Sequence, residues 1–279
     1  MFLKLIYITN IPSVALIAEK NGVDRIMVDL EILGKEERQR NMNTVKSHHT
    51  IEDVRAISSV LTSSELLVRV NPWNENSVDE IEAVIASGAD RIMLPMWKTV
   101  DEASFFLGLV NGRVHTTLLL ETKEAVDILD EILKHPQIDE IYIGLNDLHL
   151  SYGLTFMFEL LSNGVVERIC QKCKQSGIPY GFGGVAKIGE GLLPAESIVM
   201  EHYRLGSSRV ILSRSFCNTE EITDLATIEA VFSDNLILLR EFERSLANIS
   251  DRDYSENVKN VKHRVEMIVD KIKEKRRSE

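Results

Sequence analysis

The sequence lacks the patterns that mark several classes of protein. No apolar run approaches the roughly 18 residues of a transmembrane helix. Residues 1–6 begin like a strand, without the cleavage site of a signal peptide. Acidic side chains outnumber basic ones by 43 to 32, a formal net charge of −11 that argues against non-specific nucleic-acid binding and membrane-surface attachment. We therefore expect a cytoplasmic protein that binds neither nucleic acid nor membrane.

Cysteine is also scarce, which limits the metal and redox chemistry open to the chain. Cys170 and Cys173 form a CxxC pair inside a helix-like segment, and no second pair exists. A zinc site needs further ligands, and a redox pair usually stands at the start of a helix. We expect these two cysteines and Cys217 to be three reduced thiols.

The apolar residues alternate with helical segments along most of the 279-residue chain. A composition of 44% hydrophobic and 27% charged residues suits a soluble protein with an ample core. Continuous apolar runs are typical of strands buried on both faces, as in parallel sheets. Eight such runs are predicted strands: 4–9, 24–31, 66–71, 91–97, 118–122, 141–147, 178–184 and 209–216.

Helical periodicity separates these runs and continues after the last of them. Predicted helices cover 12–22, 50–61, 77–88, 99–110, 123–135, 156–177, 196–205 and 227–249. Eight strands alternating with eight helices predict a (β/α)₈ TIM barrel with extra C-terminal helices. An open doubly wound sheet is the alternative.

We divide the chain into a barrel core at 1–220, a long helix at 221–250 and a charged helical tail at 251–279. The long helix either completes the barrel or is exchanged between subunits. Apolar residues three and four apart in the tail form a seam for another helix. That seam fits either a subunit contact or packing on the chain's own barrel.

Two acidic residues stand at the ends of neighbouring strands. Glu121 follows Leu118-Leu119-Leu120, and Asp147 ends the run that begins at Ile141, with a helical stripe between them. A strand–helix–strand unit makes the strands parallel neighbours, so both acids should lie at the carboxyl end of the sheet. Two carboxylates brought together repel unless a cation or proton lies between them. We predict a divalent metal held by this pair; the alternative is that both are helix N-caps.

Several strand ends, taken in order and spacing, resemble the HpcH/HpaI aldolase and citrate lyase β-subunit family of the phosphoenolpyruvate/pyruvate barrel superfamily. The specific part is Glu-Thr at 121–122, followed 26 residues after Glu121 by the aspartate of Gly-x-x-Asp-Leu. The segments that carry the similarity are 28–31, 68–71, 93–95, 120–122 and 143–148.

The resemblance implies a role for each matching residue. Glu121 and Asp147 match the family's Mg²⁺ or Mn²⁺ ligands, and oxygen-only ligands suit those ions. Arg69 matches an arginine that steadies the oxygen of an enolate, a charge that forms when a carbon–carbon bond beside a carbonyl breaks. Arg69 could instead pair structurally with Asp29 or Glu31.

The chain departs from the aldolase branch where that branch carries a histidine after its second strand. Ile32-Leu-Gly occupies the position, so the candidate general bases are His48, His49 and His149. Asp29 and Glu31 match the acidic pair of the citrate-lyase branch and are predicted to hold water or substrate near the metal.

The last two strands end in residues that could bind an anionic part of a substrate. Gly183, Gly184 and Arg214 are candidates for such a site, with Asn146 beside the metal ligand Asp147. The alternative is that the glycines ease a tight turn after the strand.

These features predict a metal-dependent carbon–carbon lyase that acts on a 2-oxo acid, such as a 4-hydroxy-2-oxo acid, through a metal-bound pyruvate enolate. One alternative is a citrate-lyase-like enzyme acting on CoA thioesters, although no basic cluster can be assigned to the CoA phosphates. A non-catalytic barrel serving as an assembly subunit is the other. The resemblance implies a homo-oligomer, either a trimer or a hexamer.

Overall fold

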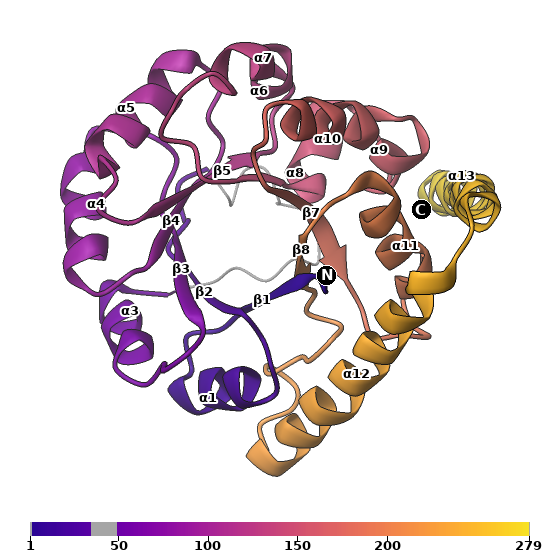
Figure 1. Ribbon diagram of the computed structural model, residues 1–279, viewed down its shortest axis with the longest axis horizontal. Coiled ribbons are helices and arrows are strands. Elements are labelled where there is room, and N and C mark those ends of the chain that lie inside the picture. The colour runs from indigo at the N-terminus through magenta and orange to yellow at the C-terminus, as the bar shows by residue number, and fades with distance from the viewer. Residues whose placement is uncertain (1, 35–48, 279) are drawn as a thin grey trace.

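The computed structural model describes residues 2–34 and 49–278. Eight strands close into a barrel in the order β1 to β8, and every neighbouring pair is parallel, including β1 with β8. Helices surround this barrel, and two long helices follow it (Figure 1). The predicted (β/α)₈ barrel with extra C-terminal helices is confirmed.

The strands are short and begin close to the predicted positions. Their bounds are β1 Lys4–Ile8, β2 Arg25–Asp29, β3 Glu65–Arg69, β4 Arg91–Leu94, β5 His115–Leu120, β6 Ile141–Ile143, β7 Tyr180–Val185 and β8 Arg209–Leu212. Those of the helices are α1 Pro12–Lys20, α3 Ile51–Ser58, α4 Ser77–Ala86, α5 Val100–Val110, α6 Lys123–Asp127, α7 Leu129–Ile132, α8 Leu145–Ser151, α9 Glu159–Ser162, α10 Val165–Gln175, α11 Ala195–Leu205, α12 Leu225–Ser245 and α13 Asp251–Ser278.

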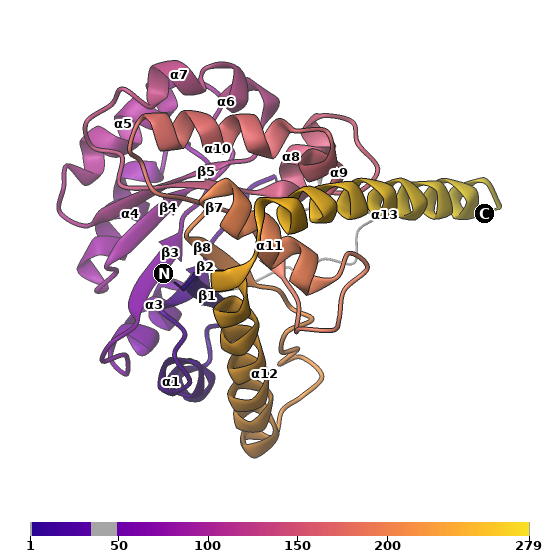
Figure 2. The ribbon, with the colours of Figure 1, turned by 45° about the vertical axis from the view of Figure 1, so that its right-hand side comes forward.

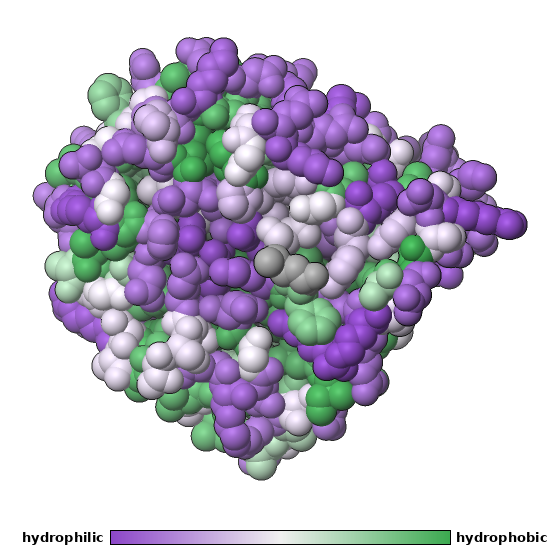
Figure 3. All heavy atoms as spheres, viewed as in Figure 1, coloured by the Kyte–Doolittle hydropathy of each residue, from purple (hydrophilic) through white to green (hydrophobic). Residues whose placement is uncertain are grey.

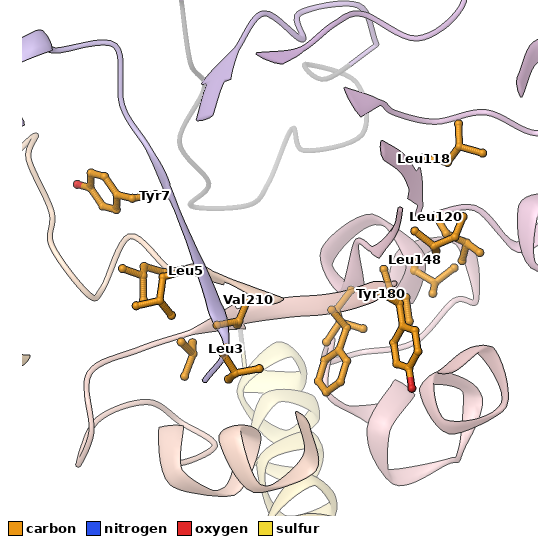
Figure 4. Packing of buried hydrophobic residues seen from close by; sticks show 14 of the residues in the cluster. Leu3, Leu5, Tyr7, Leu118, Leu120, Leu148, Tyr180 and Val210 are labelled. Carbon is orange, nitrogen blue, oxygen red and sulfur yellow. The ribbon is translucent and has the colours of Figure 1, made fainter. Parts of the chain in front are cut away.

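Alternate residues of each strand point to opposite sides of the barrel wall. The outward set packs against the helices and forms the larger core, of which Leu5, Tyr7, Leu118 and Val210 are members (Figure 4). The inward set forms a separate apolar cluster in the middle of the barrel. Its members are Ile6, Met27, Leu67, Met93, Leu119 and Tyr142, with Ile8 and Ile211 packed against them.

Charged residues lie two positions before and after this apolar cluster on the same strands. On β2, for example, Arg25 precedes Met27 and Asp29 follows it. On β3, Glu65 and Arg69 flank Leu67 in the same way. The interior is therefore layered, with a charged floor at the amino ends of the strands, an apolar middle and a charged mouth at their carboxyl ends.

Two predicted helices are interrupted, and the bounds of several others differ by a few residues from those expected. The segment 123–135 divides into α6 and α7 at Ile128, and 156–177 divides into α9 and α10 at Gly164. Gly164 has φ +78, a left-handed conformation that glycine adopts readily and that ends a helix. The helix predicted at 227–249 runs from Leu225 to Ser245 and continues as a short 3₁₀ turn.

The helices α3 and α5 each begin with a capping box. Thr50 accepts a hydrogen bond from the backbone N–H of Asp53, whose side chain accepts one from Thr50 in return. Thr99 and Glu102 form the same reciprocal box at the start of α5. Each box satisfies backbone donors that the first helical turn leaves without partners.

The C-terminal helices pack on the barrel of their own chain and then extend past it. α12 lies against α1, burying Ile228, Phe232 and Leu239. α13 packs on α9 and α11 through Val261 and Val265, and its last turns project beyond the barrel (Figure 2). In the view of Figure 3 the side of the molecule on which α13 lies is largely hydrophilic, and apolar residues elsewhere form small separate patches. Within the described residues, no helix is both long enough and apolar enough to cross a membrane.

The three cysteines are buried free thiols, as predicted. Cys170 and Cys173 lie on the inner face of α10, away from solvent. Burial raises the pKa of both thiols, that of Cys173 to about 12. Since the thiolate is the reactive form, burial disfavours redox or metal-binding chemistry at both residues.

A buried histidine on α11 makes the fold sensitive to acid. His202 stacks on Phe182 with ring centroids 3.7 Å apart, and its Nδ1 lies 2.7 Å from Ser207 Oγ. Burial lowers the pKa of His202 from 6.5 to about 3. The unfolded chain therefore takes up this proton at a higher pH than the folded one, so the contribution is present above pH 6.5 and is lost as pH falls toward 3.

We predict that His202→Gln flattens the decline in unfolding free energy between about pH 7 and about pH 5, because each pH unit below the unfolded pKa costs up to roughly 1.4 kcal/mol at this site. Urea unfolding over that range measures it. The control is His263→Gln, which alters an exposed histidine of α13 and should keep the wild-type slope. Equal slopes for all three proteins would contradict the assignment.

Candidate active site

The mouth of the barrel collects the predicted site residues from several strands. Asp29, Arg69 and Glu121 each lie two residues after a member of the central apolar cluster, so their side chains enter the mouth of the barrel. Asp29 is 2% exposed and Glu121 is 3% exposed. The alternation of each strand therefore places charged groups where barrels of this class carry their chemistry.

Glu121 is held in place by backbone from two neighbouring strand ends. The backbone N–H of Met96 donates a hydrogen bond to Oε1 at 3.1 Å. Met96 has φ 54, an uncommon value for a residue other than glycine, and this conformation accompanies the bond to the carboxylate. On the other side, a Cβ added to Gly144 would lie 2.7 Å from Oε2. Both carboxylate oxygens are thus confined.

Asp147 lies on a helix and not at the end of a strand. β6 ends at Ile143, and α8 begins at Leu145, so Asp147 is its third residue. The prediction that the strand runs to Asp147 is wrong, because Gly144 turns the chain directly into a helix. Neither acid is an N-cap, since Thr122 caps α6 and Gly144 precedes α8.

Arg69 is the cation at the mouth, and it binds the two acids that follow β2. Its Nε and Nη2 each donate to a different oxygen of Asp29 at 2.8 Å. Its Nη1 lies 3.3 Å from Glu31 Oε2. Although burial opposes its charge, Asp29 and Glu31 raise the pKa of Arg69 well above its usual value. The pairing suggested as an alternative from the sequence is present, and it fixes the direction of the guanidinium.

Negative charge exceeds positive charge in this buried group. Asp29, Glu31, Glu121 and Asp147 are all buried, with Arg69 beside them. Burial, then Asp147 and Glu31, raise the pKa of Glu121 well above the usual range of a glutamate, although Arg69 opposes the shift. Such a carboxylate takes up a proton or binds a cation.

Two carboxylates at the mouth match the number that Mg²⁺ commonly takes from a protein. No group of three or more acidic, histidine or cysteine side chains suited to a metal occurs among residues 2–34 and 49–278. Mg²⁺ commonly keeps several waters and takes only one or two carboxylates from the protein. Glu121 and Asp147 could supply those two, leaving the remaining positions for water and substrate.

His49 lies beside Asp29 at the mouth of the barrel. The sequence suggested it as a candidate base but did not indicate which way its ring points. Its Nδ1 accepts a hydrogen bond from the backbone N–H of Asp29 at 3.0 Å. The neutral ring in this arrangement carries its proton on Nε2. To act as a base through Nδ1, His49 would have to give up this bond, and its role as general base stays a prediction. His48 lies outside the described residues.

His149 is buried on α8 and contacts the backbone of its own helix. It stands two residues after Asp147 on α8, about 200° around the helix. Its Nδ1 lies 3.2 Å from the carbonyl oxygen of Leu145, and burial lowers its pKa. The role of His149 as general base stays a prediction.

Of the two glycines predicted for an anion site, Gly183 has a structural explanation and Gly184 has none. Gly183 has φ +57, and an added Cβ would lie 2.8 Å from Leu145 Cδ1, so both backbone and packing require glycine. A Cβ on Gly184 would make only ordinary contact with Ser213 at 3.5 Å. Arg214 lies 3.6 Å from Glu220, and Asn146 sits in the first turn of α8. Binding of an anionic substrate group here stays a prediction.

Asn71 is a site residue whose role the sequence did not reveal. Its side-chain oxygen accepts hydrogen bonds from the backbone N–H groups of Ile32 and Leu33 at 2.9 and 3.0 Å. Its own amide donates to Glu80 of α4 at 2.8 Å. The polar residue after β3 thus fastens the segment that follows Glu31.

The fold and the site together define a (β/α)₈ barrel with an acidic, arginine-containing site at the carboxyl ends of its strands. The chain belongs to the HpcH/HpaI aldolase/citrate lyase family, whose model matches residues 5–186. Membership indicates a lyase that acts on carbon–carbon bonds, in a family that is generally dependent on a divalent metal. No curated protein matches the sequence.

Several solved structures share the fold at low sequence identity. The HpcH/HpaI aldolase from Desulfitobacterium hafniense DCB-2 is 15% identical with a TM-score of 0.62, covering 82% of this chain and 93% of its own. An HpcH/HpaI aldolase/citrate lyase family protein from Burkholderia cenocepacia J2315 is 17% identical with a TM-score of 0.59, covering 88% and 94%. The citrate synthase SbnG is 16% identical with a TM-score of 0.59, covering 82% and 94%.

We predict that Gly144→Ala displaces Glu121 and lowers the unfolding free energy by about 1–3 kcal/mol, as overpacking of a filled site does. The matched control is Gly108→Ala on α5, where an added Cβ meets nothing within 4 Å. That change should leave stability unaltered or raise it by about 0.4–1 kcal/mol. Chemical denaturation compares the two, and equal effects would show that Gly144 is not needed for close packing on Glu121.

Proposed function

We propose that the protein is a divalent-metal-dependent aldolase that makes or breaks the bond between C3, the carbon next to the carbonyl of a 2-oxo acid, and C4. A 4-hydroxy-2-oxo acid is the substrate class that we favour. The observation that carries this proposal is the excess of buried carboxylates at the mouth, which calls for a cation close to Glu121 and Asp147. Family membership supports the reaction type.

Glu121 and Asp147 would hold Mg²⁺ or Mn²⁺, which would supply a Lewis acid for the 2-oxo acid when bound. Arg69 would stabilise the oxygen that becomes negative when the bond breaks. All three of its nitrogens already contact Asp29 or Glu31, and each terminal nitrogen has a second N–H to offer. Asp29 and Glu31 therefore serve to orient Arg69 before substrate arrives.

A citrate-lyase-like reaction on a CoA thioester is the second candidate. The Asp29 and Glu31 pair, which resembles that branch, favours it because both acids are buried at the mouth. A comparison of 4-hydroxy-2-oxo acids with citryl- and malyl-CoA as substrates separates the two candidates. Turnover of the CoA thioesters alone would replace the aldolase proposal.

We predict that chelation abolishes oxaloacetate decarboxylation and aldol cleavage, and that Mn²⁺ restores both. Glu121→Gln and Asp147→Asn should each weaken Mn²⁺ binding by more than the roughly 10–100-fold that removal of an outer-shell hydrogen-bond partner causes. Electron paramagnetic resonance of Mn²⁺ measures the binding. Glu102→Gln, a carboxylate of the α5 cap, is the control and should bind normally. Wild-type affinity in either site variant would remove that residue from the metal site.

We predict that Arg69→Lys lowers kcat by about 100–1,000-fold, as loss of one oxyanion donor does, while Mn²⁺ affinity stays within a few-fold of wild type. Lysine keeps a positive charge beside Asp29 and Glu31. The variant therefore tests the role of the guanidinium N–H groups better than alanine would. Steady-state kinetics and the Mn²⁺ titration measure the two effects. An equal loss of kcat and of Mn²⁺ affinity would contradict the role assigned to Arg69.

We also propose a homo-oligomer, in which α12 and the projecting part of α13 contact neighbouring subunits. Ile237 is 55% exposed and Leu238 is 46% exposed on α12. α13 carries nine basic and six acidic residues, a net positive charge in a chain whose total is −11, so it suits the acidic surface of another copy.

Sedimentation velocity tests this assembly. We predict that Ile237→Glu with Leu238→Glu shifts the protein toward monomer, because it places charge on an apolar contact. Val78→Glu, at a 50% exposed position on α4, is the control and should leave the assembly unchanged. A monomeric wild type, or a double variant that sediments like wild type, would overturn the proposal.

A further inference from the structure

The floor of the barrel, at the opposite end from the candidate active site, is built from charged residues. Arg25, Arg91 and Arg209 begin β2, β4 and β8, and Glu140 directly precedes β6. Each lies two residues before a side chain of the apolar middle, so these four side chains from alternate strands form one layer. Glu65, the first residue of β3, joins them.

Glu140 is already surrounded by donors. It is 1% exposed, and Arg25 Nη1 donates to its two oxygens at 2.9 and 2.7 Å. Thr117 Oγ1 donates to Oε1 at 3.2 Å, and Arg209 Nε lies 3.0 Å from Oε2. This one carboxylate therefore has little capacity left for further guanidinium N–H groups.

Donors remain unused in the same layer. Arg209 is 6% exposed and Arg91 is 5% exposed. Within the described parts of the chain, Arg209 Nη1 and Arg91 Nε are buried atoms with no hydrogen-bond partner. A buried donor without a partner is unfavourable, because it has lost its hydrogen bonds to water and gained none in the protein. Gly181 makes room for Arg209, because an added Cβ there would lie 2.4 Å from Arg209 Cγ.

The floor also carries a net positive charge. Three guanidinium groups face two carboxylates, and Glu65 pairs with both Arg25 and Arg91. Burial lowers the pKa of Arg209, and Arg25 and Arg91 lower it further, while Glu140 opposes them. An uncompensated charge inside a protein is costly unless a counter-charge lies beside it.

We propose that the barrel floor binds a small monovalent inorganic anion, such as chloride, against the guanidinium of Arg209. The single negative charge of such an ion balances the excess of one positive charge at the floor. The ion only accepts hydrogen bonds, so it suits guanidinium N–H groups that lack partners. A water molecule could accept these hydrogen bonds, but it would not neutralise the excess positive charge. The site is separate from the mouth, so it does not depend on the proposed reaction.

Thermal and urea unfolding in potassium chloride and in potassium gluconate at equal ionic strength test the proposal. Gluconate serves as the bulky anion that the buried layer cannot admit. A ligand that binds only the folded state multiplies the folding equilibrium constant by about elevenfold at ten times its dissociation constant. We expect a saturable rise in stability with chloride and none with gluconate. Identical curves in the two salts would overturn the proposal.

Two variants move the expected effect in opposite directions. Arg209→Met leaves two guanidinium groups facing two carboxylates, so the chloride effect should disappear. Glu65→Gln raises the excess from one charge to two, so chloride should act at lower concentration. Arg113→Met, which removes a surface partner of Glu82, is the control and should keep the wild-type response. A chloride effect that survives Arg209→Met would place the ion elsewhere.

Crystals of the wild-type protein soaked in bromide give a test that does not depend on the folding of any variant. We expect an anomalous peak within hydrogen-bonding reach of Arg209 Nη1. Bromide found only on the outer surface, with no peak at the floor, would also overturn the proposal.

Discussion

Four buried carboxylates around one guanidinium at the mouth of the barrel set the constraint on which the site depends. Arg69 is committed to Asp29 and Glu31, and it opposes the rise in the pKa of Glu121 without cancelling it. Repulsion between Glu121 and Asp147 must therefore be relieved by a proton or a cation. We expect the same excess charge that makes the mouth costly to bury to give it an affinity for a divalent ion.

The barrel holds this charge in place through the alternation of its strands. An apolar layer that includes Met27, Leu67 and Leu119 fills the middle, so the charged groups above and below are separated by hydrocarbon. The mouth has an excess of acids and the floor an excess of arginines, and neither end neutralises the other. Backbone constraints add precision at the mouth, where Met96 and Gly144 confine Glu121.

Much of the fold could be predicted because local patterns and long-range packing agree. Apolar runs, helical periodicity and the capping boxes at Thr50 and Thr99 all indicate the observed elements. The position of Asp147 on a helix could not be predicted from the sequence. The apolar residues from Ile141 to Leu145 look like one continuous strand, but the chain turns at Gly144 and α8 begins at Leu145. The positive φ of Met96 likewise has no local sequence signal.

Other features had a signal that is visible only when two parts of the chain are compared. Asp-Arg-Ile-Met occurs at 24–27 and again at 90–93. In both copies the aspartate accepts a backbone N–H, from Leu5 and from Leu66, and the arginine enters the floor. The direction of His49 could not be inferred, because it depends on the backbone N–H of a residue 20 positions earlier.

The most direct test of the charge at the mouth is the number of protons released when Mn²⁺ binds. Calorimetric titrations in two buffers with different enthalpies of ionisation yield that number. Because the raised pKa of Glu121 keeps a proton in the metal-free site, binding should release protons at a pH where an ordinary glutamate is fully ionised, and Glu121→Gln should remove the release. Binding without proton release, or no binding at the mouth, would contradict the account.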